Sequence, residues 1–169
     1  MYEITARELS EQKTLVRRAK VHGDAISDFL GETYAAVATA VQEGGFSFAG
    51  PPFGRYRPLD DGSEFEIEAG FPVYGEGTPG GDVEVSSLPA GRAAVVAHFG
   101  LYDAMMPAYQ AVLTWLADNG HSPEGPAWEV YYSDPDEQPD PATWRTEIYR
   151  STPRSARSLN RPGPGSWLL

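Results

Sequence analysis

The stretch Gly125-Pro126-Ala127-Trp128-Glu129-Val130-Tyr131 places a single carboxylate in the middle of a run of aromatic and β-branched residues. Turn-forming residues bound this run on both sides, so the pattern predicts a β-strand. Because successive side chains of a strand point to opposite faces, Glu129 and Tyr131 share one face and Trp128 and Val130 share the other. We therefore expect an acid beside a phenol on one face and an ordinary core on the other.

The same stretch occurs 75 residues earlier, as Gly50-Pro51-Pro52-Phe53-Gly54-Arg55-Tyr56. In this register, and without a gap, Tyr34–Tyr56 is identical to Tyr109–Tyr131 at nine of 23 positions. Chance would give about one or two identities. The pattern predicts a tandem duplication in which Gly54 stands where the second copy has Glu129. Two related halves that face each other would bring one carboxylate and one missing side chain to a shared region.

Each copy also contains a helix with an apolar stripe. Apolar residues recur at spacings of three and four over Ile26–Val41, with Asp24 as a candidate N-cap and Gly44-Gly45 as a stop signal. A second helix is expected over Leu101–Asn119, where Pro107 is tolerated only because it falls near the first turns. Strand patterns precede and follow both helices.

These patterns predict an α+β fold of two pseudosymmetric β-α-β-β modules that form a joined antiparallel sheet with two main helices. The first module is expected at about residues 14–73 and the second at about residues 82–151, with the glycine-rich residues 74–81 as their linker. Residues 1–152 then form one domain. The composition of residues 153–169, rich in Pro, Ser, Gly and Arg, predicts a disordered tail.

Composition excludes several classes of function. The chain has no run of 18 apolar residues and no signal-peptide pattern, so no membrane contact is expected and the default location is the cytoplasm. The absence of cysteine removes disulfides, thiolate catalysis and thiolate metal sites. A net charge of −11 repels phosphate backbones, so direct nucleic-acid binding is not expected, and the same charge attracts cations.

No motif in the chain predicts a metal or a cofactor. His22, His98 and His121 show no ligand spacing, and no G-x-S-x-G nucleophile motif occurs. The glycines of residues 75–80 match the spacing of a dinucleotide fingerprint, but Pro79 interrupts them and a strand pattern follows in place of a helix. Catalysis, if there is any, would have to use carboxylates and phenols.

Four segments together resemble those of a known family. They are Glu68-Ala69-Gly70-Phe71-Pro72-Val73, His98-Phe99-Gly100-Leu101-Tyr102-Asp103, Gly125-Pro126 with Trp128-Glu129-Val130-Tyr131, and Thr146-Glu147-Ile148-Tyr149. Over about residues 14–151 the chain resembles the GyrI-like small-molecule-binding domain, which occurs alone or fused to DNA-binding domains in multidrug-responsive regulators. The resemblance implies an apolar, aromatic-lined central groove between two modules, in which Glu129 contacts cationic drugs. Roughly 13 residues precede the first repeat, fewer than a DNA-binding module needs, so this chain is not expected to control transcription itself.

Glu129 is the main candidate for ligand binding, because an unpaired carboxylate among aromatic residues is costly unless a cation pairs with it. The other ligand-binding candidates are aromatic residues of both halves, for each of which plain core packing is the alternative: Phe53, Tyr56, Phe71, Tyr109, Trp128, Tyr131 and Tyr149. In an enzyme, Glu129 would act as general base, with Tyr131 or Tyr149 as hydrogen-bond donor to the developing anion.

Three functions remain open. The first is a module that sequesters or senses amphipathic, aromatic and cationic small molecules through apolar burial, cation–π contacts and one charge pair. The second is a metal-free hydrolase of strained-ring (cyclopropanoid) or other electrophilic molecules, an activity that the resemblance implies for one branch of the family. The third is an inhibitor that acts on a protein partner. One glutamate in an aromatic groove serves the first two equally, so the sequence does not separate them, and it does not predict an oligomeric state.

Overall fold

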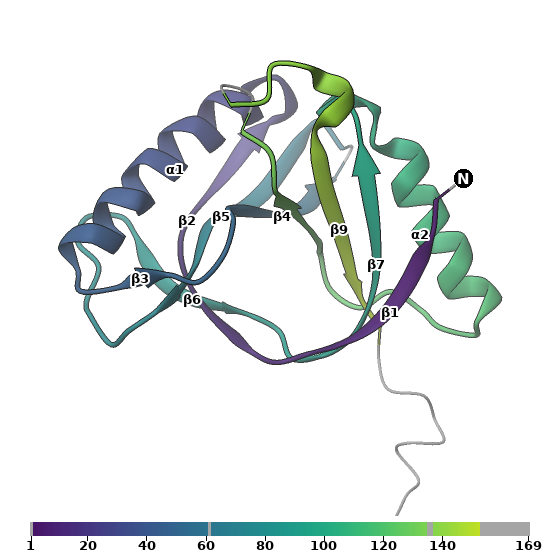
Figure 1. Ribbon diagram of the computed structural model, residues 1–169, viewed down its shortest axis with the longest axis horizontal. Helices are drawn as coiled ribbons and strands as arrows, with labels where there is room; N and C mark the ends of the chain where they lie inside the picture. The colour runs from purple at the N-terminus through teal and green to yellow at the C-terminus, as the bar shows by residue number, and fades with distance from the viewer. Residues whose placement is uncertain (1, 61, 135–136, 153–169) are drawn as a thin grey trace, which may run out of the picture.

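Two long helices and a curled antiparallel sheet make up the computed structural model, which describes residues 2–60, 62–134 and 137–152 (Figure 1). The expected α+β fold class, with two helices and one joined antiparallel sheet, is confirmed. The predicted disordered tail, residues 153–169, lies outside the described residues.

In the described residues, two strands precede the first long helix, five lie between the two long helices, and two follow the second. In chain order they are β1 Ile4–Leu9, β2 Gln12–His22, α1 Ile26–Glu43, β3 Ser47–Phe48, β4 Phe53–Leu59, β5 Glu64–Tyr74, β6 Glu84–Leu88, β7 Gly91–Phe99, α2 Met106–Asp118, β8 Ala127–Tyr131 and β9 Arg145–Ser151. Within the described residues, eight strands pair in the order β1-β7-β9-β8-β4-β5-β2-β6, and the short β3 pairs with β5 beside this path. Every pairing is antiparallel.

The connections between strands force the sheet to curl. Five strands lie between β1 and β2 in the sheet order, yet only residues 10–11 join them along the chain. Residues 89–90 likewise join β6 to β7, which lie near opposite ends of the same order. Two residues span about 10 Å at most, so the two ends of the sheet must come together there. Figure 1 shows both links crossing beneath the sheet.

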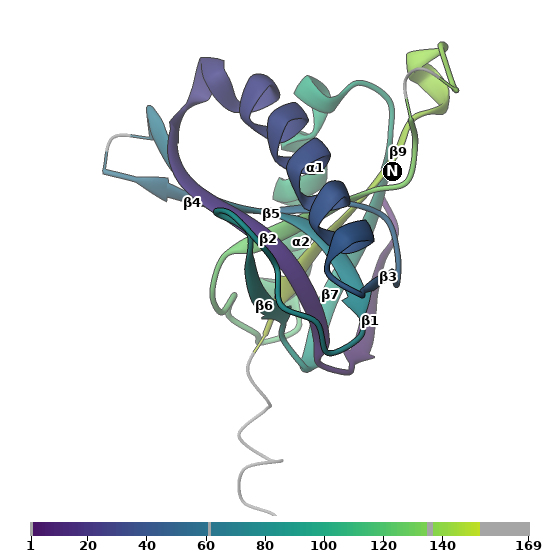
Figure 2. The ribbon, with the colours of Figure 1, turned by 90° about the vertical axis from the view of Figure 1, so that its left-hand side faces the viewer.

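Helix α1 packs on β2 and β5, as Figure 2 shows, with its apolar stripe toward the sheet. The predicted N-cap is wrong: α1 begins after a 3-10 turn at Gly23–Ala25, its N-cap is Ala25, and the Asp24 carboxylate instead lies 2.7 Å from Nδ1 of His22. The end of α1 follows the prediction, since Gly44 is the C-cap and Gly45 has a left-handed φ of 82°.

Helix α2 packs on the other half of the sheet. It begins later than predicted, because residues 102–104 form a separate 3-10 turn, and Pro107 falls in its first turn as expected. Ala108, Val112 and Leu116 are buried and pack with strand residues such as Ile148. This spacing of three and four residues places one stripe of α2 against the sheet.

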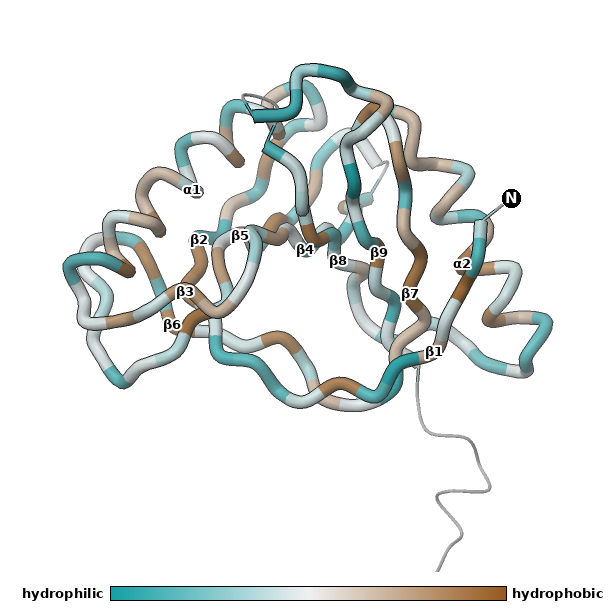
Figure 3. The backbone as a smooth tube through the Cα atoms, in the orientation of Figure 1, coloured by the Kyte–Doolittle hydropathy of each residue, from teal (hydrophilic) through white to brown (hydrophobic). Residues whose placement is uncertain are grey.

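The sheet therefore has two different faces. Both helices pack on one, which we call the helix face. The opposite face carries its own buried cluster, in which Val16, Phe53, Val95, Trp128 and Tyr149 come from five different strands. Figure 3 shows hydrophobic residues concentrated in the strands, notably β7, and a hydrophilic loop between β8 and β9. The alternation of side chains along each strand is what separates these two cores.

Two glycine substitutions should change stability in opposite directions. A Cβ at Gly70 in β5 would lie 1.8 Å from the carbonyl oxygen of Leu15, a contact that only backbone movement relieves. Gly70→Ala should therefore lower the free energy of unfolding by about 3 kcal/mol or more. Gly31 is exposed within α1 and has open space around it, so Gly31→Ala should raise stability by about 0.5–1 kcal/mol. Urea denaturation of both variants tests the packing, and a mild effect at Gly70 would contradict it.

Candidate functional site

Glu129 lies near the centre of the sheet, on the helix face. Strand β8 pairs with β4 on one side and with β9 on the other, so Glu129 is directly opposite Gly54 and Ile148. Ile148 packs in the cluster beneath α2, which fixes the direction in which Glu129 points. Glu129 is only 8% exposed. A carboxylate at such a position has lost most of its water and must find other donors.

Tyrosine hydroxyls replace that water. Tyr131, two residues along β8, donates to Oε1 of Glu129 at 2.8 Å, and Tyr109 on α2 donates to Oε2. Tyr56 on β4 lies with its hydroxyl 2.5 Å from that of Tyr131. Because Tyr131 gives its single proton to Glu129, Tyr56 must be the donor to Tyr131. The four side chains form one hydrogen-bonded chain, Tyr56 to Tyr131 to Glu129, with Tyr109 on the second carboxylate oxygen.

No cation accompanies this carboxylate within the part of the chain that the structure describes, where every salt bridge involves another acid. His98 is buried; its Nε2–H donates to the carbonyl oxygen of Leu101, and its Nδ1 lies 3.1 Å from the hydroxyl oxygen of Tyr2. Burial raises the pKa of Glu129 above its ordinary value. The hydrogen bonds from Tyr109 and Tyr131, and the field of His98, act in the opposite direction without cancelling that effect.

Gly54 makes room for this arrangement. A Cβ at Gly54 would lie 2.7 Å from the hydroxyl oxygen of Tyr56 and 3.0 Å from its Cζ, so the Tyr56 ring occupies the space of the missing side chain. In the 75-residue register, Tyr56 corresponds to Tyr131 and Gly54 to Glu129. Tyr131 meets a carboxylate two residues back in its own strand, whereas Tyr56 has none and reaches across to Tyr131 instead.

Further aromatic rings surround the chain of hydroxyls. Tyr34 on α1, the counterpart of Tyr109, donates to the carbonyl of Phe53 at 2.9 Å. Tyr102 meets the ring of Tyr131 edge-on at 5.7 Å and stacks on Trp144 at 5.0 Å. Tyr34, Tyr102 and Trp144 were not among the predicted site residues. The repeat pattern offered a signal for Tyr34, since its partner Tyr109 was a candidate.

The remaining candidates fall into two groups. Phe71 lies on the helix face and meets the ring of Tyr34 edge-on at 5.7 Å. Phe53, Trp128 and Tyr149 are on the opposite face, where Tyr149 stacks on Trp128 with ring centres 5.3 Å apart. The structure thus brings Glu129 together with Tyr56, Tyr109 and Tyr131, and separates it from Tyr149 by the thickness of the sheet.

Other kinds of site find no support in the described residues. No group of three or more His, Cys, Asp or Glu side chains there is placed to hold a metal ion. None of the helices described is long and apolar enough to cross a membrane.

One family model matches most of the chain, and several solved structures share its fold. The GyrI-like small molecule binding domain matches residues 3–150. No curated protein sequence matches the chain. The EcmrR C-terminal domain is 22% identical to this chain, with a TM-score of 0.79 over 90% of this chain and 98% of that domain. In the EcmrR–DNA complex, the match covers 57% of the EcmrR chain. The structure of SAV2435 bound to tetraphenylphosphonium is 15% identical with a TM-score of 0.61, covering 90% and 94% of the two chains. A hydrolase from Listeria innocua is 12% identical, with a TM-score of 0.60 over 89% and 92%. At these identities the structures share the fold.

Filling the space at Gly54 should uncouple Tyr56 from the site. Gly54→Ala should leave the fold intact, because the nearest atom is the tip of the Tyr56 side chain, but should lower stability by about 1 kcal/mol as the hydroxyl loses Tyr131. In a Tyr56→Phe background, the same substitution should cost clearly less. A double-mutant cycle by urea denaturation measures this coupling, and equal costs in both backgrounds would contradict it.

Proposed function

The chain belongs to the family of GyrI-like small-molecule-binding domains, and we propose that it sequesters or senses amphipathic organic cations, with Glu129 as the group that pairs with the positive charge. The observation that carries this proposal is a buried carboxylate whose hydrogen-bond donors, among the described residues, are neutral phenols. Desolvation disfavours its charge, and a cation would supply the missing partner.

The rings around Glu129 suit the rest of such a ligand. Tyr34, Tyr56, Tyr109 and Tyr131 present aromatic surface, and the face of a ring attracts a cation through its quadrupole. A delocalised aromatic cation gains from the rings and the carboxylate together, whereas a strongly hydrated metal ion would give up water for few oxygen ligands. SAV2435, which shares the fold, was solved with a ligand of this kind, tetraphenylphosphonium.

A ligand must displace an aromatic ring to reach the carboxylate, because Glu129 is 8% exposed. Tyr102 lies on the 3-10 turn before α2, and its ring contacts both Tyr131 and Trp144. Among the described residues its hydroxyl donates to the carbonyl of Ser133 at 3.3 Å, so moving Tyr102 breaks one long hydrogen bond and two ring contacts. We infer that the cation enters between Tyr102 and the ring of Tyr131.

Hydrolysis of an electrophilic small molecule is the second candidate function, and the raised pKa of Glu129 favours it. A carboxylate whose pKa moves up toward neutrality is a better general base, and the hydroxyl of Tyr109 or Tyr131 would donate a hydrogen bond to a developing anion. One of the structures with this fold is that of a hydrolase. Turnover of a strained-ring substrate that Glu129→Gln abolishes would favour this function over binding alone.

Replacing the carboxylate should remove the selectivity for cations. In Glu129→Gln the affinity for tetraphenylphosphonium should fall by about 1.5–3 kcal/mol, because the amide keeps the shape but not the charge. Tetraphenylborate, an anion of the same shape, should not bind more weakly to the variant than to the wild type. Isothermal titration calorimetry measures both ligands, with Glu64→Gln at an exposed end of β5 as the control for net charge. Equal losses of tetraphenylphosphonium affinity in both variants would refute the proposal.

The same carboxylate should make binding depend on pH. Because the pKa of Glu129 is raised, its proton is retained to a higher pH than that of an ordinary glutamate. The affinity for tetraphenylphosphonium should therefore fall as the pH drops through this raised pKa, and binding should release protons in that range. The free energy of unfolding without ligand should change with pH in the opposite direction. The folded state holds this proton more tightly than the unfolded state, so stability is lost as the pH rises through the raised pKa. Glu129→Gln should remove that loss. A flat pH profile for the wild type would contradict the assignment.

A further inference from the structure

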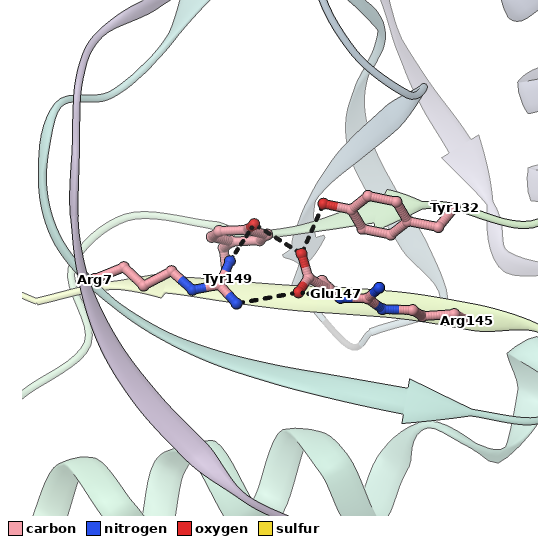
Figure 4. A network of polar contacts seen from close by, with 5 residues as sticks. All are labelled: Arg7, Tyr132, Arg145, Glu147 and Tyr149. Atoms are coloured by element: carbon pink, nitrogen blue, oxygen red, sulfur yellow. Dashed lines mark hydrogen bonds and ion pairs between the residues drawn. The ribbon is translucent and has the colours of Figure 1, made fainter.

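A second buried carboxylate lies on the opposite face of the same strand pair. Glu147 on β9 is 2% exposed, and its neighbour Ile148 points to the helix face, whereas Glu147 itself faces away from α2. Tyr132 and Tyr149 donate to its Oε1 at 2.7 and 3.0 Å (Figure 4). Arg7 and Arg145 donate to its Oε2 at 3.3 and 3.0 Å. Phenols thus hold one oxygen and guanidinium groups the other.

The cluster carries more positive than negative charge. Two guanidinium groups converge on one carboxylate, and their side chains remain 45% and 44% exposed. Burial acts to raise the pKa of Glu147, but the hydrogen bonds from Tyr132 and Tyr149 and the charge of Arg7 outweigh it, so the pKa lies below its ordinary value. Glu147 is therefore ionised at neutral pH, and the three charges sum to +1 on a chain whose net charge is −11.

Both guanidinium groups are also fixed in place. Arg145 lies over the ring of Tyr132 at 4.7 Å, and Arg7 lies 6.0 Å from the ring centre of Tyr149, to whose hydroxyl it also donates. Only one guanidinium nitrogen of Arg145 has a hydrogen-bond acceptor among the described residues, so the guanidinium retains donors for a ligand. Donors that are already ordered cost little further entropy when a ligand binds.

A cavity of about 500 Å³ opens beside this cluster. Its polar lining includes Thr5, Arg7, Arg145 and Glu147, and its apolar lining is Val95, Ala97 and Phe99 of β7. Phe99 is 62% exposed, an unusual position for so large an apolar ring. The cavity therefore combines fixed cationic donors with an apolar wall, of which the Phe99 ring is the exposed part.

We propose that Arg7 and Arg145 form a second ligand site, on the opposite face of the sheet from Glu129, that binds a small amphipathic organic anion such as an aromatic carboxylate. The anion takes the free guanidinium donors, and the apolar part of the ligand covers Val95, Ala97 and Phe99. The site does not depend on the proposed cation site, because its residues come from β1, β7, β9 and the loop after β8 and none of them contacts Glu129.

One residue of the cavity opposes an anion. Glu3 is exposed at the lining, and its negative charge weakens the field of the two arginines. Removing that charge should strengthen binding by about two- to threefold, the scale of an exposed charge interaction. The site therefore predicts substitutions of opposite effect, loss at Arg145 and gain at Glu3.

The test compares 2-naphthoate with its neutral analogue 2-naphthamide by isothermal titration calorimetry. The wild type should bind naphthoate about tenfold or more tightly than the amide, since charge-assisted hydrogen bonds to guanidinium distinguish them. Arg145→Gln should remove most of this preference. Arg57→Gln makes the same change in net charge at an exposed arginine that pairs only with Glu66, and should leave the preference unchanged. Equal affinities of the wild type for the two compounds, or equal losses in the two variants, would overturn the proposal.

Three further measurements keep the test decisive if Arg145→Gln does not fold. Glu3→Gln should bind naphthoate more tightly than the wild type, and unchanged or weaker binding would overturn the proposal. Phe99→Ala should weaken naphthoate and naphthamide by similar factors, because it removes the apolar wall and no charge. Saturating tetraphenylphosphonium should not displace naphthoate. Displacement would place both compounds in one site and would overturn the proposed anion site. Failure of tetraphenylphosphonium to bind would instead contradict only the proposed cation site at Glu129.

Discussion

Burial of the Glu129 carboxylate is the constraint on which the helix face depends. Both of its oxygens need donors, and they come from Tyr131 on the same strand and Tyr109 on α2. A third tyrosine, Tyr56 on β4, extends this chain into the first half of the sheet. Because a buried acceptor left without a donor costs about 1–3 kcal/mol, these hydrogen bonds hold α2 and the two central strands in one arrangement.

Strands β8 and β9 each carry a buried carboxylate, and the two carboxylates are stabilised by different hydrogen-bond donors. Glu129 receives only neutral phenol donors, and burial raises its pKa. Glu147 receives two phenols and two guanidinium groups, and its pKa falls in spite of burial. The phenols alone thus do not compensate the lost hydration of a full charge, and adding positive charge reverses the balance. The two faces of this strand pair consequently surround their buried carboxylates with different charges.

The sequence predicted what depends on local periodicity. Period 2 within one strand correctly placed Glu129 with Tyr131 and against Trp128, and the two helices fell where the apolar stripes were. The register between strands was beyond reach: Tyr149 is opposite Trp128 only because of how β9 pairs with β8 after the intervening loop. The partnership of Arg7 with Glu147 spans 140 residues and depends on β1 pairing with β7, for which no local pattern gives a signal. Asp24 failed as an N-cap because a 3-10 turn separates it from α1.

The difference between Gly54 and Glu129 follows from the same register. The two positions are directly opposite each other on adjacent strands, where Cβ atoms are about 5 Å apart. If both carried a glutamate, two desolvated carboxylates would face each other on the helix face, and one of them would have to bind a proton or a cation for the other to ionise. With Gly54 on one side, a single carboxylate remains, and the ring of Tyr56 fills the space that the second would have taken. The difference between the two halves thus leaves one negative charge among phenols, which is the charge that the proposed cation would pair with.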